Sequence, residues 1–463
     1  MPRTRLVSTA LVLLAALALA AGCSRDEGRS ENSPATPRSV LLIGLDGFEW
    51  KVAREMLADG GLPNLARLMR DGVSGELAST RPTLSPIIWT SIATGVSGKR
   101  HGINGFVKAD SEGEQRLYTS RDRRAKALWN IVGDAGRSST TVGWWNTFPV
   151  EQIRGVMVAQ VNTISPKMRR AGAGIWKGKL VRELDGQIYP PELEQRVLAI
   201  VPEVEAAVDD LVTDILGELP ELPDDMARGY LQQSRWAFRA DSIYHRVGIE
   251  LLRSEPPSDL FSIYFGGADV VGHRFWRYSY PDLYRHPPSD AEVAALGHVL
   301  ERYYGYLDSI VGELVEAAPE GTDVLIVSDH GMRPVNRSAR YSRPTLSGGH
   351  LSTPPAFFVA AGPRIRNSRD PAVTTGTRQP GSLGSILDIA PTVLALLDVA
   401  VGRDMEGEVI TDVIDPGWLG DHPVQFVSTH TDEAWLADRD SSSPEVRGQV
   451  ERLEQLRSLG YIE

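Results

Sequence analysis

Aspartate and histidine side chains that could bind divalent metal ions follow three separate apolar runs of this 463-residue chain. The runs and the residues after them are 40–45 with Asp46, 260–265 with Asp269 and His273, and 324–327 with Asp329 and His330. Carboxylate and imidazole groups are common ligands of zinc. Two divalent ions about 4 Å apart can hold the attacking and leaving oxygens of a displacement at phosphorus. The residue types therefore predict a metal-dependent hydrolase.

Two further positions complete the predicted site. His350 follows two glycines, which let the backbone approach a site closely, and a strand is expected soon afterwards at 356–361. Ser85 is expected at the N-cap of a helix over 87–95, with Pro86 at the first helical position, where its missing N–H costs nothing. A hydroxyl there faces the positive end of the helix dipole, which attracts anions. The alternative is that Ser85 only caps the helix.

These residues predict two metal sites. The first combines the Ser85 oxygen with Asp46, Asp329 and His330, and the second consists of Asp269, His273 and His350. A hydroxyl bound to a metal ion loses its proton more readily than a free serine, which yields a nucleophile at neutral pH. Zinc is the expected metal because imidazole and carboxylate ligands suit it, and manganese is the alternative.

The three apolar runs are expected to be buried parallel strands, because they are short, continuous and bounded by glycine or polar residues. The carboxyl ends of parallel strands meet at one edge of a sheet, where α/β proteins bind their ligands. Further strands are predicted at 73–77 and 139–143, and helices at 49–56, 63–70, 291–317, 385–397 with an interruption at Pro391, and 451–459. This pattern predicts an α/β fold.

Residues 164–254 differ from the rest of the chain in composition, because charged amphipathic stretches alternate with short proline-rich segments. They are expected to form a mostly helical insertion that caps the site and sets substrate choice rather than the chemistry. The catalytic core is then formed by residues 38–163 and 255–463.

The N-terminus is expected to direct the protein out of the cytoplasm. Arg3 and Arg5 precede an apolar stretch, and small residues then lead to Cys23, which predicts a signal peptide over 1–22. The end of this segment resembles a bacterial lipoprotein cleavage site, which implies a lipid on Cys23. Cys23 is the only cysteine, so it has no disulfide partner. The alternatives to a lipoprotein signal are a plain signal peptide and an uncleaved anchor helix. Residues 24–37 are expected to form a flexible tether.

The same residues resemble the alkaline phosphatase superfamily, closest to its type I phosphodiesterase / nucleotide pyrophosphatase branch. The matching motifs, in the order of the family, are Leu45-Asp46-Gly47, the Ser85 turn with Thr94-Gly95 and His101-Gly102-Ile103, Asp269 with Gly272-His273, Ser328-Asp329-His330-Gly331-Met332, and Gly349-His350. The resemblance implies a three-layer α/β/α sandwich with a mainly parallel central sheet. It also implies a bimetallic site, usually zinc, and a covalent phosphoryl intermediate on a serine or threonine.

Counting back from Thr94-Gly95 in the family's pattern places the nucleophile on Ser85, with Thr83 as the weaker candidate. The nucleotide pyrophosphatases carry an asparagine three residues after their nucleophile, where it contacts a phosphoryl oxygen. Ile88 occupies that position here. The candidates for substrate contact are Asn146, Asn104 and Trp144.

Together these features predict hydrolysis of a small-molecule or envelope phosphate ester, a diester rather than a monoester, by a membrane-anchored lipoprotein in the periplasm or at the cell surface. The alternatives are transfer of a phosphoryl or phosphoethanolamine group on the same site, and a non-catalytic, metal-stabilised lipoprotein that binds the envelope. A formal net charge of −11 argues against a nucleic-acid polymer as partner. A sulfatase is disfavoured because Ser85 lacks the x-Pro-x-Arg sequence that follows the sulfatase nucleophile.

Overall fold

The computed structural model describes residues 38–109, 115–164, 175–180, 184–222, 224–253, 256–338, 346–367 and 382–440. The predictions for the signal peptide, Cys23, the tether and the helix at 451–459 lie outside the described residues. Within these ranges, no helix combines the length and the apolar composition needed to cross a bilayer.

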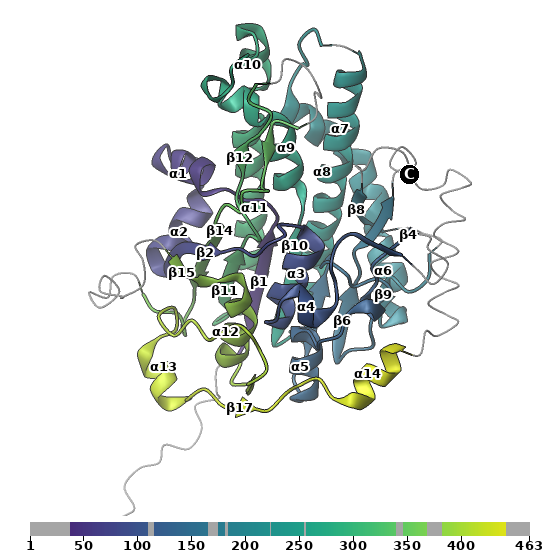
Figure 1. The fold of residues 1–463 in the computed structure, drawn as a ribbon, viewed down its shortest axis with the longest axis vertical. Coiled ribbons are helices and arrows are strands. Elements are labelled where there is room, and N and C mark those ends of the chain that lie inside the picture. The colour runs from purple at the N-terminus through teal and green to yellow at the C-terminus, as the bar shows by residue number, and fades with distance from the viewer. Residues whose placement is uncertain are drawn as a thin grey trace, which may run out of the picture. The chain divides into compact units, whose positions relative to one another are not determined.

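A nine-stranded sheet forms the centre of the fold, with β1 near its middle (Figure 1). The strands, in spatial order, are β15 (Ser382–Ser385), β2 (Val73–Ala78), β14 (Ala356–Ala361), β11 (Asp323–Val327), β1 (Val40–Leu45), β10 (Leu260–Phe265), β5 (Ser139–Val142), β6 (Gly155–Val158) and β9 (Ile188–Tyr189). Most neighbours pair in parallel, whereas β14 is antiparallel to β11 and β2, and β9 is antiparallel to β6. The predicted α/β fold with a mainly parallel sheet is confirmed.

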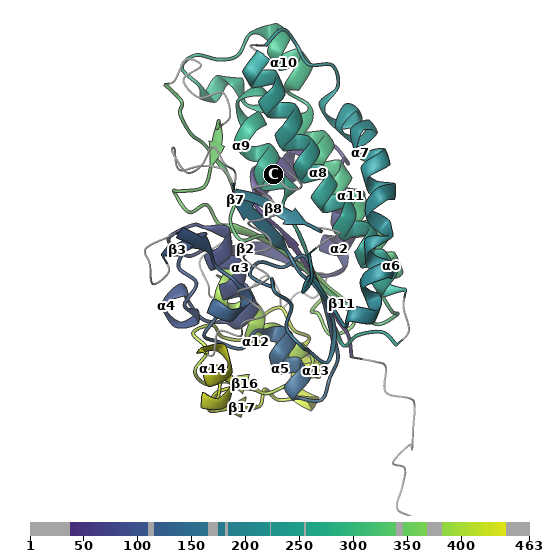
Figure 2. The ribbon, with the colours of Figure 1, turned by 90° about the vertical axis from the view of Figure 1, so that its right-hand side faces the viewer.

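Helices cover both faces of this sheet, because successive strand residues point to opposite sides. In β1, Leu41 and Ile43 belong to one hydrophobic cluster, whereas Val40 and Leu42 belong to the other. The first cluster includes α1 (Trp50–Ala58), α2 (Pro63–Asp71), α7 (Ile200–Leu216), α8 (Asp224–Leu252), α9 (Gly267–Ser279) and α11 (Val299–Ala317). The second includes α3 (Ser85–Thr94), α5 (Leu128–Asp134) and α12 (Ile389–Leu396). Figure 2 shows the two helical layers on opposite sides of the strands.

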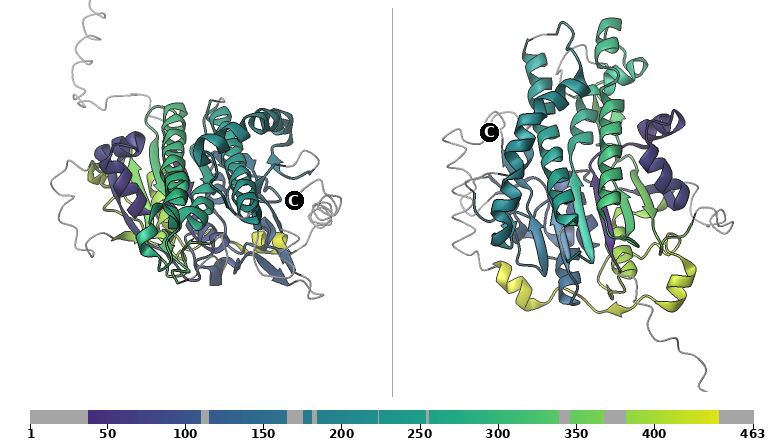
Figure 3. Two further views of the ribbon diagram at one scale, coloured as in Figure 1. Left: turned by 90° about the horizontal axis from the view of Figure 1, so that it is seen from above. Right: turned by 180° about the vertical axis from the view of Figure 1, so that it is seen from behind.

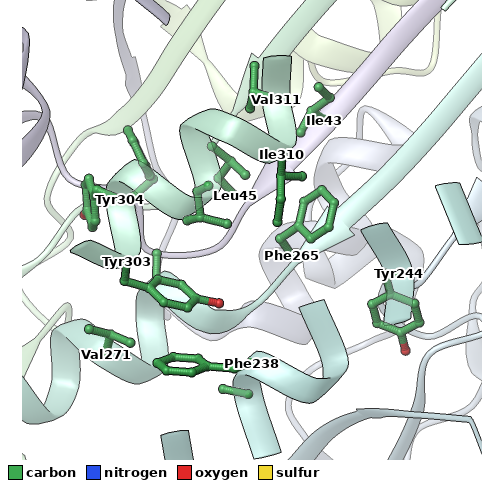
Figure 4. Packing of buried hydrophobic residues seen from close by; sticks show 14 of the residues in the cluster. Ile43, Leu45, Phe238, Tyr244, Phe265, Val271, Tyr303, Tyr304, Ile310 and Val311 are labelled. Carbon is green, nitrogen blue, oxygen red and sulfur yellow. The ribbon is translucent and has the colours of Figure 1, made fainter. Parts of the chain in front are cut away.

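The predicted insertion contributes to the first helical layer. It contains α6 (Glu194–Leu198), α7 and α8, which run along one face of the sheet in the view from behind in Figure 3. Helix α8 packs directly on β10 and β5. Figure 4 shows Phe238 of α8 beside Tyr303 of α11, and their rings are stacked with centroids 4.6 Å apart. The boundaries 164–254 stay a prediction, but α8 is a component of the sandwich.

Shorter elements complete the described fold. The remaining α-helices are α4 (Gly98–His101), α10 (Asp290–Leu296), α13 (Pro416–Asp421) and α14 (Glu433–Asp440). Four separate pairs of strands are β3 (Val107–Ala109) with β4 (Gln115–Leu117), β7 (Val161–Ile164) with β8 (Ile175–Lys179), β12 (Arg333–Pro334) with β13 (Gly348–Gly349), and β16 (Val401–Gly402) with β17 (Phe426–Val427).

Two helix predictions are wrong in detail. Residues 291–317 do not form one helix, because α10 ends and α11 begins around Gly297, and glycine is a poor helix former. The Gly297 carbonyl instead accepts a 2.8 Å hydrogen bond from Ser279 Oγ at the end of α9. Pro391 does not interrupt a helix, because it is the third residue of α12. The N–H groups of a first helical turn have no partner within the helix, so proline is tolerated there.

Candidate metal centre

The carboxyl ends of three adjacent parallel strands, β11, β1 and β10, carry the predicted metal ligands. Asp46 follows β1 directly, Asp329 follows β11 after one residue, and Asp269 lies in the first turn of α9, which follows β10. The strands are in register, with Ile43 opposite both Ile263 and Ile326. The sheet order therefore brings the three aspartates to one edge, as expected.

Asp46, Asp329 and His330 form the first group of donors, and one oxygen or nitrogen of each lies within 4.8 Å of the others. The Nε2 atom of His330 lies 3.2 Å from Asp329 Oδ2 and 3.7 Å from Asp46 Oδ1. All three side chains are fully buried. This arrangement matches the residues of the first predicted metal site other than Ser85.

Asp269, His330 and His350 form the second group, again with donor atoms within 4.8 Å of one another. His350 Nε2 lies 3.7 Å from Asp269 Oδ1, and the rings of His330 and His350 are stacked with centroids 3.9 Å apart. His273 is not a member of this group, although its Nε2 lies 3.2 Å from the same Asp269 oxygen. The structure therefore brings Asp269 and His350 of the second predicted set together with His330, and it places His273 beside Asp269.

Backbone carbonyls determine which nitrogen of His330 and of His273 can bind a cation. His330 Nδ1 lies 3.0 Å from the carbonyl oxygen of Gly331, and His273 Nδ1 lies 2.8 Å from that of Gly348. A carbonyl only accepts hydrogen bonds, so each Nδ1 carries a proton, which leaves Nε2 as the atom that can bind a metal ion. This second hydrogen bond is typical of histidines that bind metals.

Burial favours the neutral form of His330 and His350. It lowers the pKa of His330, and it lowers the pKa of His350 to about 3, with the neighbouring His330 as the second cause. Neutral imidazole is the form that binds a metal ion. The three aspartates are no more than 5% exposed, and burying several carboxylates together is costly unless positive charge accompanies them. The donor set therefore fits divalent metal ions.

Ser85 is the first residue of α3 and is 3% exposed. The prediction that it is the N-cap is wrong, because the carbonyl of Leu84 accepts the first helical hydrogen bond, from Ile88 N at 3.1 Å. Leu84, with an extended backbone, is the N-cap, and Pro86 takes the second helical position. Ser85 nevertheless remains at the positive end of the helix.

The segment before Ser85 leaves the sheet at the edge that carries the aspartates. Leu77, near the end of β2, pairs with Ala356 at the start of β14, and β14 runs antiparallel to β11. Ser79 Oγ then donates a 2.7 Å hydrogen bond to the carbonyl oxygen of Asp329. The Thr83 hydroxyl lies 3.1 Å from that of Thr353, whose N–H donates to the His350 carbonyl at 2.8 Å. Both nucleophile candidates thus belong to a segment in contact with the metal centre's loops.

Comparison with known proteins identifies the family. The model of the type I phosphodiesterase / nucleotide pyrophosphatase family matches residues 40–364. The chain belongs to this family. Human (Homo sapiens) ectonucleotide pyrophosphatase/phosphodiesterase family member 7 is 20% identical over 328 residues, which are 71% of this chain and 55% of that protein. The chain thus spans about half the length of the curated relative that it matches.

A solved structure is similar in fold. The crystal structure of the wild-type alkaline phosphatase PafA has a TM-score of 0.54 at 14% identity, and the match covers 83% of this chain and 100% of that one. This likeness confirms the alkaline phosphatase-like sandwich that the motifs imply.

Ile88 departs from the pattern of nucleotide pyrophosphatases in this family, and it is fully buried in the core. Asn146, a candidate replacement for the missing asparagine, donates through Nδ2 to the Pro86 carbonyl at 3.1 Å and to Thr90 Oγ1 at 2.9 Å. Asn146 has a positive φ of 57°, which asparagine tolerates better than most residues. Its amide therefore holds the first turn of α3, immediately after Ser85.

The other two candidates for substrate contact lie elsewhere. Trp144 is 1% exposed, donates from its indole N–H to the Trp89 carbonyl at 3.0 Å, and packs edge-on against the Trp89 ring. This environment favours a role in core packing. Asn104 is exposed, and its side chain donates to the carbonyl of Gly102 at 3.2 Å.

Two buried side chains that sequence reasoning missed contact the first donor group or the segment that follows it. Tyr264, inside β10, donates a 2.5 Å hydrogen bond to Asp46 Oδ2. Burial and the neighbouring Asp46 raise the pKa of Tyr264 well above its usual value, so it remains a donor. Glu49 accepts a 2.7 Å hydrogen bond from the N–H of Met332, and any side chain at Gly331 would collide with it. Local residue spacing could not predict either contact, because each one joins segments over 200 positions apart.

Proposed function

We propose that this chain is a two-metal hydrolase of phosphate esters, with diesters as its principal substrates. Membership in the type I phosphodiesterase / nucleotide pyrophosphatase family supports phosphate-ester hydrolysis. The observation that carries the proposal for this chain is the pair of donor groups that share His330 at the carboxyl edge of the sheet. A single structural ion would not require two such groups.

In this proposal the donors divide between two ions. Asp46, Asp329 and His330 would hold one ion, and Asp269, His273 and His350 the other. When bound, such ions lower the pKa of an oxygen nucleophile and stabilise negative charge on the phosphoryl oxygens. Zinc suits this donor set, and manganese is the alternative.

Ser85 supplies the nucleophile in this proposal. In the first step, Ser85 Oγ forms a bond to phosphorus while the bond from phosphorus to the leaving alcohol breaks, and the alcohol takes up a proton. In the second step, a water oxygen bonds to phosphorus and the Ser85 Oγ–P bond breaks, which releases a phosphomonoester from a diester and restores the hydroxyl. The positive end of α3 favours the phosphoryl oxygens beside Ser85. Asn146 holds the first turn of that helix in place.

Replacing Ser85 tests the mechanism. The Ser85→Ala variant should lose turnover of an aryl phosphodiester, and elemental analysis should show a metal content close to that of the wild type. The Thr83→Ala variant is the matched control, and it should remain active. Full activity of Ser85→Ala, or loss of activity in Thr83→Ala alone, would contradict the assignment. Product analysis of the wild type separates hydrolysis from phosphoryl or phosphoethanolamine transfer, because only hydrolysis uses water as the acceptor.

We also propose that Cys23 carries a lipid that holds the enzyme at a membrane outside the cytoplasm. The apolar segment before Cys23 and the absence of any other cysteine in the chain support this. Wild-type protein should be recovered with the membrane fraction, and the Cys23→Ser variant should be released from it.

A further inference from the structure

A buried carboxylate in the middle of α8 binds the start of the helix that carries Asp269. Asp241 is 1% exposed. Its Oδ1 atom accepts a hydrogen bond from the N–H of Gly266, and its Oδ2 atom accepts one from the N–H of Gly267, both at 2.9 Å. The hydroxyl of Tyr303 in α11 donates to Oδ2 at 2.6 Å. Asp241 therefore connects three elements: α8, α9 and α11.

The contact satisfies backbone groups that the fold would otherwise leave without an acceptor. Gly266 is the N-cap of α9 and Gly267 is its first residue, and the first N–H groups of a helix have no partner within it. Both glycines are buried, so an acceptor from the protein is needed. A negative charge at this end also interacts favourably with the helix dipole.

The start of α9 has little freedom to move. A side chain at Gly267 would collide with the Tyr303 hydroxyl and would lie 2.7 Å from Asp241 Oδ2. Asp269 comes two residues after Gly267, and His273 follows one turn later on the same helix. The direction in which α9 begins therefore determines where both side chains lie relative to His350.

We propose that Asp241 is a positioning residue for the predicted metal group of Asp269, His273 and His350, and that it acts through the start of α9. The inference rests on the proposed function, because that function makes the group a metal site. It also gives the segment 164–254 a part in building the metal centre, beyond the role in substrate choice that the sequence predicts.

The same chemistry occurs at a second helix start, which supplies a matched control. Asp308 in α11 is 2% exposed and accepts hydrogen bonds from Asn64 N at 3.1 Å and Leu65 N at 2.8 Å, in the first turn of α2. Helix α2 carries none of the predicted ligands. Asp308→Asn should therefore destabilise the fold to a similar extent as Asp241→Asn, without a specific effect on metal binding.

Calorimetric titration of the metal-free full chain with zinc tests the proposal. Two binding phases are expected in the wild type, and the Asp269→Asn variant identifies the phase that belongs to its group. Asp241→Asn should weaken that phase roughly 10- to 100-fold, the usual effect of removing a group that orients a ligand. The other phase should stay unchanged, and Asp308→Asn should leave both phases unchanged.

Several outcomes would overturn the inference. Equal weakening of both phases in Asp241→Asn, an equal effect of Asp308→Asn, or no effect of Asp241→Asn would each do so while leaving the proposed function intact. A wild type that binds no zinc would overturn the proposed two-metal function as well. If Asp241→Asn does not fold, Tyr303→Phe removes one hydrogen bond to the same carboxylate. A several-fold weakening of the assigned phase in that variant supports the proposal, and an unchanged phase overturns it.

Discussion

The two donor groups of the metal centre share His330 but are positioned by different kinds of structure. Asp46 and Asp329 come within two residues of the central strands β1 and β11, and their side chains are fully buried. Asp269 and His273 lie on α9 instead, and His350 lies in the loop before β14. The side chains of His273 and His350 are 21% and 12% exposed.

This difference has consequences for metal exchange and for mutation. The sheet's own hydrogen bonds fix the ends of β1 and β11, so the first group depends mainly on the core. The second group depends on contacts with other segments, such as Asp241 at the start of α9 and the Gly348 carbonyl at His273. We expect the second group to release its ion more readily, and to be more sensitive to substitutions far from the metal centre.

The largest expected effect comes from removing the residue that both groups share. His330→Ala should abolish the binding phase of the first group, weaken the other phase and abolish turnover, because His330 is a ligand of the first proposed ion and its ring stacks on His350 of the second group. His273→Ala should weaken only the phase assigned by Asp269→Asn, because His273 contacts Asp269 but belongs to neither group of mutually close donors. Metal content by mass spectrometry and turnover of an aryl phosphodiester measure both. If His330→Ala left the phase assigned by Asp269→Asn unchanged, the two groups would be independent, and His330 would serve only the first.

Local patterns in the sequence were enough to predict most of this centre. Asp46, Asp329 and His330 follow apolar strands closely, and adjacent parallel strands end at one edge, so their proximity follows from the fold class. The order of the strands, with β1 between β11 and β10, is a tertiary property that the sequence does not encode locally. The resemblance to a known family supplied the three-layer architecture.

The parts that could not be predicted depend on contacts between distant segments. Glu49 and Met332 are 283 positions apart, and Tyr264 and Asp46 are 218 apart. Tyr264 looked like an ordinary apolar strand residue. The helix boundaries near Gly297 and Pro391 were also missed. The apolar spacing of a helix continues across such a boundary, so spacing alone does not show where one helix ends and the next begins.

Glu49 tests the first donor group from outside the metal ligands. Glu49→Gln replaces one carboxylate oxygen by an NH2 group. If Oε1 still accepts the hydrogen bond from Arg333, this NH2 group faces the N–H of Met332 and cannot accept its hydrogen bond. We expect zinc affinity of the first group to fall roughly 10- to 100-fold, with the second phase unchanged. Glu55→Gln is the control, because Glu55 lies on α1 with a half-exposed side chain paired to Lys51. If Glu49→Gln weakened only the second phase, Glu49 would support the second donor group and not the first.

The smallest expected effect comes from Tyr264→Phe, which removes the hydrogen bond to Asp46 Oδ2 without changing the ring's packing on Trp89. Zinc affinity should fall less than in Glu49→Gln, because Asp46 also stays fixed by the end of β1. At pH 8 the variant should lose about 1.5 kcal/mol of unfolding free energy, the lower end for a hydrogen bond to a charged group.

The pH dependence of that loss identifies the phenol as its source. Burial and Asp46 raise the pKa of Tyr264 in the folded protein, whereas an unfolded tyrosine titrates near a pKa of about 10. The stabilisation is therefore fully present below about pH 10 and is lost as pH rises further, because the unfolded state then releases the proton and the folded state does not. Phenylalanine has no such proton, and the other tyrosines titrate in both proteins. The difference between wild type and Tyr264→Phe in denaturant unfolding should shrink between pH 8 and 11, and a constant difference would show that Tyr264 does not donate to Asp46.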